Sequence, residues 1–152
     1  MFSKRKIIAR LLLICSAASL AVHAQEPTGP IGYVMTVKGE ATVSNSGKSV
    51  QAVVGTPVLV GTELKTGPAS SMGITLKDNT VMSFGPNTHT TLDEFLFTPA
   101  QGELKLTTKI TRGTMNFISG VIAKLKPEAV TVNTPTGTIG VRGTHFLVKV
   151  EE

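Results

Sequence analysis

Turn-forming residues divide this sequence into short pieces, and this division restricts the possible folds more than any other feature. Glycine supplies the left-handed backbone conformations of tight turns, and proline ends helices and interior strands. Pieces this short leave little room for helices of ordinary length and suit short β-strands. We therefore expect an all-β domain. The turn signals are Gly47, Gly55-Thr-Pro57, Gly61, Gly67-Pro68, Gly85-Pro-Asn87, Pro99 to Gly102, Gly113, Gly120 and Pro135 to Gly137.

Several of the pieces alternate apolar with polar side chains, as strands with one buried face do. Met72–Lys77 and Thr80–Phe84 form the clearest pair, and Asp78 and Asn79 between them predict a two-residue hairpin turn. Only Ser119–Leu125 has a pattern that would suit a helical turn or two. The other expected strands are Ala41–Ser44, Thr90–Leu92, Glu103–Thr107, Thr114–Ile118, Ala129–Asn133 and His145–Val150.

The arrangement of the strands is open between two architectures. A β-sandwich or barrel is the usual product of many short strands. Glycine followed at a short interval by an apolar residue recurs, however, and such units can stack as the rungs of one core. This recurrence favours a twisted β-solenoid or roll, with a β-sandwich as the alternative. The units are Gly55 to Val58, Gly61 to Leu64, Gly113 to Phe117 and Gly137 to Ile139.

The first 24 residues have the order of parts that defines a secretory signal peptide. Basic residues precede an apolar run over residues 11–22, and the small residue Ala24 ends the segment. A run of about a dozen residues is shorter than the ~20 that a membrane-spanning helix needs. We therefore predict cleavage after Ala24, a short leader over residues 25–30 and a β domain over residues 31–152. The mature protein is expected to be periplasmic or secreted, with no transmembrane segment.

A lipid-anchored protein is the nearest alternative, because Cys15 lies inside the apolar run. The position before such a cleavage site favours small side chains, whereas Ile14 is large and branched. We therefore interpret Cys15 as an ordinary residue of the signal peptide. Its removal leaves the mature chain without cysteine, so neither disulfides nor thiolate chemistry is expected.

Export also changes the charge of the chain. Four of its 15 basic residues lie before the expected cleavage site and none of its 10 acidic residues does, so the mature chain has 11 basic and 10 acidic residues. Nucleic-acid binding requires a clustered basic surface, and the remaining charges are interspersed. We therefore expect no nucleic-acid partner. The four basic residues that are lost are Lys4, Arg5, Lys6 and Arg10.

Candidates for catalysis or metal binding are few. His89 and His145 are the histidines of the mature chain, and Asp93 follows His89 by four positions. On an extended strand this spacing separates two side chains by roughly 13 Å, which is too far for one metal ion. Nucleophile-elbow, zincin and phosphate-loop motifs are missing. We expect no catalytic residue, no metal and no cofactor, and therefore no enzyme.

The order of the motifs resembles the FecR domain, the periplasmic domain of regulators of ferric-citrate uptake. The most specific part is the run Val141-Arg-Gly-Thr-His-Phe146, which follows a Thr-Pro turn at Thr134. The resembling segments also include Gly32 to Val43, Gly55 to Gly67, Ala69 to Leu76, Asp78 to Phe84, Pro86 to Thr88 and Val132 to Pro135.

This resemblance implies a non-catalytic module outside the cytoplasm that takes part in protein contacts or envelope sensing. In FecR-type regulators, the resemblance implies a cytoplasmic anti-sigma segment that is followed by a membrane helix and then by this domain. The present chain is expected instead to be a stand-alone, exported member. The expected partner is an envelope protein, and the alternative is a cell-wall polymer such as peptidoglycan or another polysaccharide.

Four residues of the specific run form the candidate structural or interaction motif, namely Arg142, Gly143, Thr144 and Phe146. A guanidinium beside a glycine can lock a turn by donating several hydrogen bonds to carbonyls or to a carboxylate. A buried arginine must be paired in this way. The functional alternative is that Arg142 binds a carboxylate of a partner or an anionic glycan.

Overall fold

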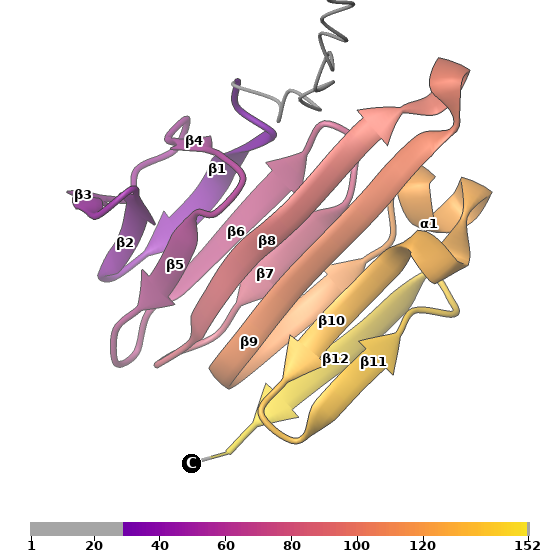
Figure 1. The fold of residues 1–152 in the computed structure, drawn as a ribbon. Coiled ribbons are helices and arrows are strands. Elements are labelled where there is room, and N and C mark those ends of the chain that lie inside the picture. Colours follow the sequence, from indigo (N-terminus) through magenta and orange to yellow (C-terminus); the bar gives the residue numbers. More distant parts are fainter. Residues whose placement is uncertain (1–28, 152) are drawn as a thin grey trace, which may run out of the picture.

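The structure, a computed structural model, describes residues 29–151, and the predicted signal peptide with its cleavage site lies outside them. The strands in Figure 1 are β1 (Gly32–Lys38), β2 (Ala41–Asn45), β3 (Lys48–Gln51), β4 (Pro57–Val58), β5 (Glu63–Thr66), β6 (Ser71–Leu76), β7 (Val81–Phe84), β8 (His89–Thr98), β9 (Glu103–Ile118), β10 (Val130–Thr134), β11 (Gly137–Gly140) and β12 (His145–Val150). The helical segments are η1 (Pro99–Gln101), α1 (Val121–Leu125) and η2 (Pro127–Ala129).

The predicted all-β class is confirmed. The strands form one strongly curled sheet, a half-barrel, whose central order is β3-β2-β5-β8-β9-β7-β6-β1-β4. Among the described residues every strand pair is antiparallel except β9 with β10. The solenoid form of the prediction is not confirmed, because stacked rungs would pair in parallel and the chain instead returns through hairpins.

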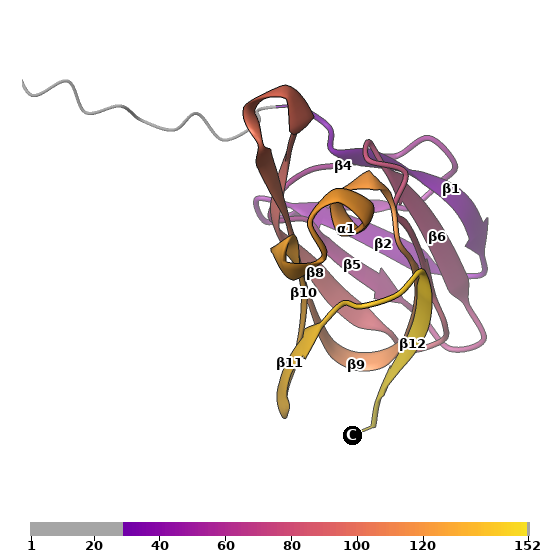
Figure 2. The ribbon, with the colours of Figure 1, turned by 90° about the vertical axis from the view of Figure 1, so that its right-hand side faces the viewer.

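The long strand β9 belongs to both walls of the half-barrel. Its first part pairs with β8 on one side and with β10 on the other, and its last part pairs with β7 and β12. In Figure 2 the two walls rise from β9, with β10 and β11 in one wall and β12 in the other. We call these the β8 wall (β3, β2, β5, β8, β10 and β11) and the β7 wall (β4, β1, β6, β7 and β12).

Gly113 lies where β9 passes from one wall to the other. Its φ is +90°, and a Cβ atom added there would lie 2.4 Å from the Cα atom of Thr88. As a turn signal, Gly113 predicts a boundary between two separate strands. The positive φ instead bends a single strand, since Gly113 still pairs with Val150 of β12.

The alternating patterns face the core as expected. In β7, Met82 and Phe84 are buried, whereas Val81 is half-buried and Ser83 is exposed. The predicted hairpin is also confirmed, because β6 pairs with β7. Its loop is one residue longer than the two-residue turn expected, since the N–H of Leu76 donates to the carbonyl oxygen of Thr80, and Asn79 in this loop has the left-handed φ of +65°. Asp78 is the one charged residue that is buried among residues 29–151, and its carboxylate accepts hydrogen bonds from Thr80.

One end of the half-barrel is covered by α1, the helical turn that the pattern of residues 119–125 would suit. Ile122 of this turn is fully buried. The strand β1 and the short strands β3, β4, β5 and β11 were not predicted from the sequence. β4 has two residues and β11 has a glycine at each end, so pairing with neighbouring strands, and not local propensity, makes them extended.

Candidate interaction surface

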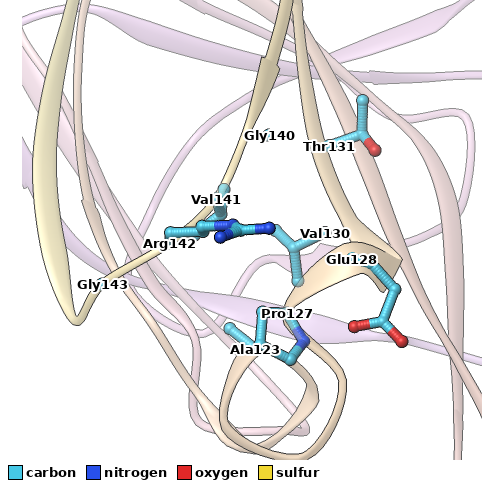
Figure 3. Close-up of a pocket in the computed structure, with 9 residues that line it drawn as sticks. All are labelled: Ala123, Pro127, Glu128, Val130, Thr131, Gly140, Val141, Arg142 and Gly143. Atoms are coloured by element: carbon cyan, nitrogen blue, oxygen red, sulfur yellow. The ribbon is translucent and has the colours of Figure 1, made fainter.

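A groove opens beside α1, between this helical turn and the segment that joins β11 to β12. Its volume is about 730 Å³. The floor carries the apolar side chains of Ala123, Val130 and Val141, and the rim carries two charged side chains, Glu128 and Arg142. Figure 3 shows Arg142 and Glu128 on different sides of the groove. The other lining residues are Pro127, Thr131, Gly140 and Gly143.

The environment of Arg142 does not fit the structural role that was expected from the sequence. Its side chain is exposed, and its guanidinium makes no hydrogen bond or ion pair among the described residues. Arg142 therefore does not lock the turn. The reason is that the chain passes over the end of the half-barrel at this point, so the side chain of Val141 is buried while that of Arg142 is exposed and extends over the groove toward Val130 (Figure 3).

Ser119 supplies the hydrogen bonds that hold this turn. Its hydroxyl donates to the carbonyl oxygen of Gly143 at 2.8 Å, and its backbone N–H donates to the carbonyl oxygen of Thr144 at 2.9 Å. Gly143 has a φ of +134°, which L-residues rarely adopt. Ser119 therefore presents Arg142 from a fixed backbone, a role for Ser119 that no sequence motif indicated.

Phe146, the last residue of the candidate motif, has a structural position. Its ring stacks on Phe117 of β9 with the centroids 4.8 Å apart and the planes at 19°. Phe117 is fully buried and Phe146 packs against the core. The motif is thus divided between two tasks, since Phe146 fastens β12 to β9 while Arg142 faces the groove.

β11 and β12 each have a free edge. Among the described residues β11 pairs only with β10, and β12 pairs only with β9. Figure 2 shows these two strands nearest the viewer on opposite walls. A second hollow of about 360 Å³ lies between them, lined by residues that include Ile139, Val148 and Val150. The half-barrel is therefore unclosed on this side.

The outer surfaces of the two walls differ in chemistry. The outer surface of the β7 wall carries two rows of side chains without a charged residue, and Tyr33, Ile118 and Leu147 in these rows are exposed by 44%, 42% and 68%. Depletion of charge and enrichment in aromatic and apolar groups are typical of protein interfaces. The rows are Pro57, Tyr33, Thr75, Val81, Ile118 and His145, and Thr36, Gly73, Ser83, Asn116 and Leu147.

The outer surface of the β8 wall is polar instead. One row of residues runs across the strands of this wall, and each of its side chains carries a hydroxyl, an amide or a charged group. Glu94 on this surface accepts hydrogen bonds from Lys105 and Thr107, and these two bonds, that of Lys105 first, lower the pKa of its carboxyl group. The row is Ser49, Ser44, Glu63, Thr91, Lys109, Asn133 and Thr138.

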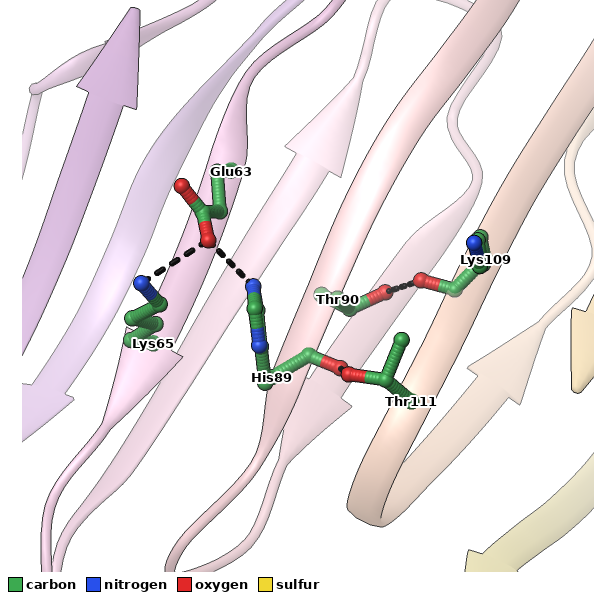
Figure 4. A network of polar contacts seen from close by, with 6 residues as sticks. All are labelled: Glu63, Lys65, His89, Thr90, Lys109 and Thr111. Carbon is green, nitrogen blue, oxygen red and sulfur yellow. Dashed lines mark hydrogen bonds and ion pairs between the residues drawn. The ribbon is translucent and has the colours of Figure 1, made fainter. Parts of the chain in front are cut away.

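His89 belongs to a surface ion-pair network and to no catalytic arrangement. Its Nε2 atom contacts the carboxylate of Glu63, which also pairs with Lys65 at 2.8 Å (Figure 4). The hydrogen bond from Lys65, with a smaller effect of His89, lowers the pKa of Glu63. Asp93 does not take part in this network. Residues 29–151 contain no group of three or more metal-ligating side chains.

The comparison with protein families decides which kind of molecule this is. Residues 62–152, more than half of the chain, match the family described as FecR protein. The chain belongs to the FecR family. No curated protein and no solved structure matches the chain. The resemblance noted from the sequence is confirmed over the matched residues, which include the run from Val141 to Phe146.

FecR proteins are regulatory, non-enzymatic modules of envelope signalling with a periplasmic type of domain. For this FecR chain, the helices in residues 29–151 are too short or too polar to span a membrane. The match begins at residue 62, so it covers the strands from β5 onward and leaves β1 to β4 outside. The groove, both free edges and the motif all lie within the matched part.

Proposed function

We propose that this protein is a non-catalytic, exported FecR module that binds another protein of the cell envelope through the groove beside α1. The observation that carries this proposal is the exposed guanidinium of Arg142 above an apolar floor. It has no hydrogen bond or ion pair within residues 29–151. An arginine in this setting suits two-point recognition of a carboxylate.

The charges at the rim support a specific orientation of the partner. Glu128 is exposed and, among the described residues, has no ion pair, so the groove presents one positive and one negative group. A peptide segment with a carboxylate near Arg142 and a cation near Glu128 satisfies both. Its apolar side chains would cover Val130 and Val141. The protein would thus act by contact with its partner and by no chemical step.

The experiment compares Arg142→Ala with the wild-type protein in stability and in binding. Because the side chain is exposed and unpaired among the described residues, its loss is expected to change the unfolding free energy by no more than about 0.5 kcal/mol. Crosslinking in whole cells is expected to recover a protein partner with the wild type and at least tenfold less of it with Arg142→Ala. Lys124→Ala on the neighbouring helical turn serves as the matched control and is expected to retain binding. Equal recovery with Arg142→Ala would overturn the proposal, as would a large loss of stability.

A cell-wall polymer is the second candidate, and the polar row on the β8 wall favours it. Hydroxyl and amide groups on neighbouring strands can donate hydrogen bonds to a polysaccharide. Tyr33, the tyrosine of the chain, lies on the other wall, so this row has no tyrosine ring on which a sugar could stack.

Sedimentation with purified peptidoglycan sacculi separates the two candidates. Binding through the polar row would remove the protein from solution, and Asn133→Ala with Thr91→Ala would then keep it soluble. Protein recognition through the groove predicts that the protein stays in the supernatant. Removal from solution that depends on the polar row would favour the polymer.

A further inference from the structure

Among the strands that lie at an end of the sheet in the described part of the chain, β12 has the longest free edge. β12 has six residues and an unbroken register with β9, whereas β3 and β11 have four residues each and β4 has two. Proteins usually protect such edges with prolines, bulges, inward-pointing charges or exposed lysines. β12 has no proline, bulge or inward-pointing charge, and the charge of its lysine, Lys149, is paired with that of Glu151 at 2.6 Å.

One hydrogen bond shows which residues of β12 direct their backbone groups toward β9 and which direct them toward the free edge. The N–H of Ser119 donates to the carbonyl oxygen of Thr144, so Thr144 directs its polar backbone groups toward β9. In an antiparallel ladder these directions alternate along the strand. Phe146, Val148 and Val150 therefore also direct their N–H and C=O groups toward β9. The backbone groups of His145, Leu147 and Lys149 point out of the free edge.

The side chains of β12 alternate in the same way. Phe146, Val148 and Val150 face the inside of the half-barrel, and they are buried or half-buried. Leu147 faces outward, and its exposed fraction of 68% is the largest among the exposed large apolar residues. A strand added at this edge would complete the ladder and cover these apolar groups.

We propose that the occupant of this edge is a second copy of the same strand, paired antiparallel about a two-fold axis at Val148. In this register Phe146 lies opposite Val150 of the second copy on the inner face. On the outer face Glu151 lies opposite His145, and Leu147 lies opposite Lys149. The two copies of Leu147 become diagonal neighbours, which long side chains can bridge.

Side-chain complementarity selects this register. Inward-facing residues of one copy lie opposite inward-facing residues of the other only when the two-fold axis passes through a residue of the strand. An axis between two residues would place inward-facing residues opposite outward-facing ones. An axis at Lys149 would place two lysines directly opposite each other, which is destabilising. An axis at Leu147 would place His145 opposite Lys149 and leave Glu151 without a cationic partner in the second copy. The axis at Val148 is the one that matches apolar with apolar groups and Glu151 with a cation.

A pair of variants at Leu147 tests the proposal, because both remove the same exposed side chain. Leu147→Lys places a lysine opposite Lys149 of the second copy, and Leu147→Glu places a glutamate there. Sedimentation velocity of the mature protein over a range of concentrations is expected to show a dimer for the wild type and for Leu147→Glu. Dimerisation of Leu147→Lys is expected to be weaker than that of Leu147→Glu by about tenfold, since two symmetric pairs change sign. The double variant Leu147→Lys, Lys149→Glu is expected to recover the dimer.

Cysteine crosslinking tests the register in the same protein, whose mature part contains no cysteine. Val148→Cys is expected to form an intermolecular disulfide, because residues at the axis are a non-hydrogen-bonded pair with Cα atoms about 4.5 Å apart. Leu147→Cys is expected to crosslink poorly. A monomer at every soluble concentration, equal dimerisation of the two charged variants, or preferential crosslinking through Leu147→Cys would each overturn the proposal. Circular dichroism of each variant confirms that the sheet is intact, and Arg142→Ala is expected to dimerise as the wild type does, which separates this proposal from the proposed function.

Discussion

The backbone N–H of Ile122 donates a hydrogen bond to the carboxylate of Asp78, 44 residues earlier in the chain, over 3.3 Å. The same carboxylate accepts bonds from the N–H and the hydroxyl of Thr80 at 3.1 and 2.7 Å. In addition, the carbonyl oxygen of Asp78 accepts from the N–H of Val121. The β6–β7 hairpin turn thus fixes the helical turn α1 and with it one side of the groove.

Replacement of Asp78 is therefore expected to be costly. Asp78→Ala removes the acceptor of three hydrogen bonds and leaves buried donors without partners, for which we expect a loss of about 3 kcal/mol in the free energy of unfolding. Asp78→Asn keeps the shape and one acceptor oxygen and is expected to lose less. Chemical denaturation measures both values. A loss below about 1 kcal/mol for Asp78→Ala would contradict this role.

Gly113 offers a second test, because it combines a positive φ with a close neighbour. Thr88 cannot move away easily, since its hydroxyl accepts from the N–H of Thr114 and donates to the carbonyl oxygen of Gly85. Gly113→Ala is expected to cost more than about 3 kcal/mol, the sum of backbone strain and steric overlap.

Gly102 provides the matched control for this substitution. Its φ of +71° is similar, but a Cβ atom there would meet nothing within 4 Å. Gly102→Ala is expected to cost about 1 kcal/mol, the backbone strain alone. Thermal unfolding of the two variants gives the comparison, and equal losses would show that the contact with Thr88 contributes nothing.

The lowered pKa of Glu63 predicts that the stability of the protein depends slightly on pH. This pKa lies below the ordinary 4.5, first because Lys65 donates a hydrogen bond to Glu63. A lowered pKa in the folded state stabilises the fold above the unfolded pKa of about 4.3, and this contribution disappears as the pH falls through the folded value. Because the pair is largely exposed, Glu63→Gln is expected to cost less than about 1 kcal/mol at neutral pH.

Denaturation of wild type and Glu63→Gln at several pH values measures this contribution. The difference between the two proteins is expected to be present at neutral pH and to disappear as the pH falls through the lowered pKa of Glu63 in the folded state. Glu103→Gln, at an exposed site without an ion pair in the described residues, is the control. A Glu63→Gln difference that persists unchanged in acid would exclude this electrostatic origin.

Local patterns alone were enough to predict several elements. The alternation in β6 and β7 and the Asp78-Asn79 turn depend on neighbours in the chain, and hairpin pairing follows from them directly. The FecR family was recognisable from the run Val141 to Phe146 for the same reason. Positions with special backbone conformations, such as Gly113, were also marked by the residue type.

Pairing between distant segments decided the rest. Whether Gly113 ends a strand or bends one depends on Thr88, β7 and β12, which meet β9 only in the folded chain. The exposure of Arg142 depends on where the segment after β11 crosses the half-barrel and on Ser119, which lies 23 positions earlier in the sequence. The amino-acid sequence by itself determined the all-β class, the strands with a clear apolar–polar alternation, the β6–β7 hairpin and the family. The tertiary structure determined the single bent strand, the groove and the open edges, because these features arise from contacts between residues that lie far apart in the sequence.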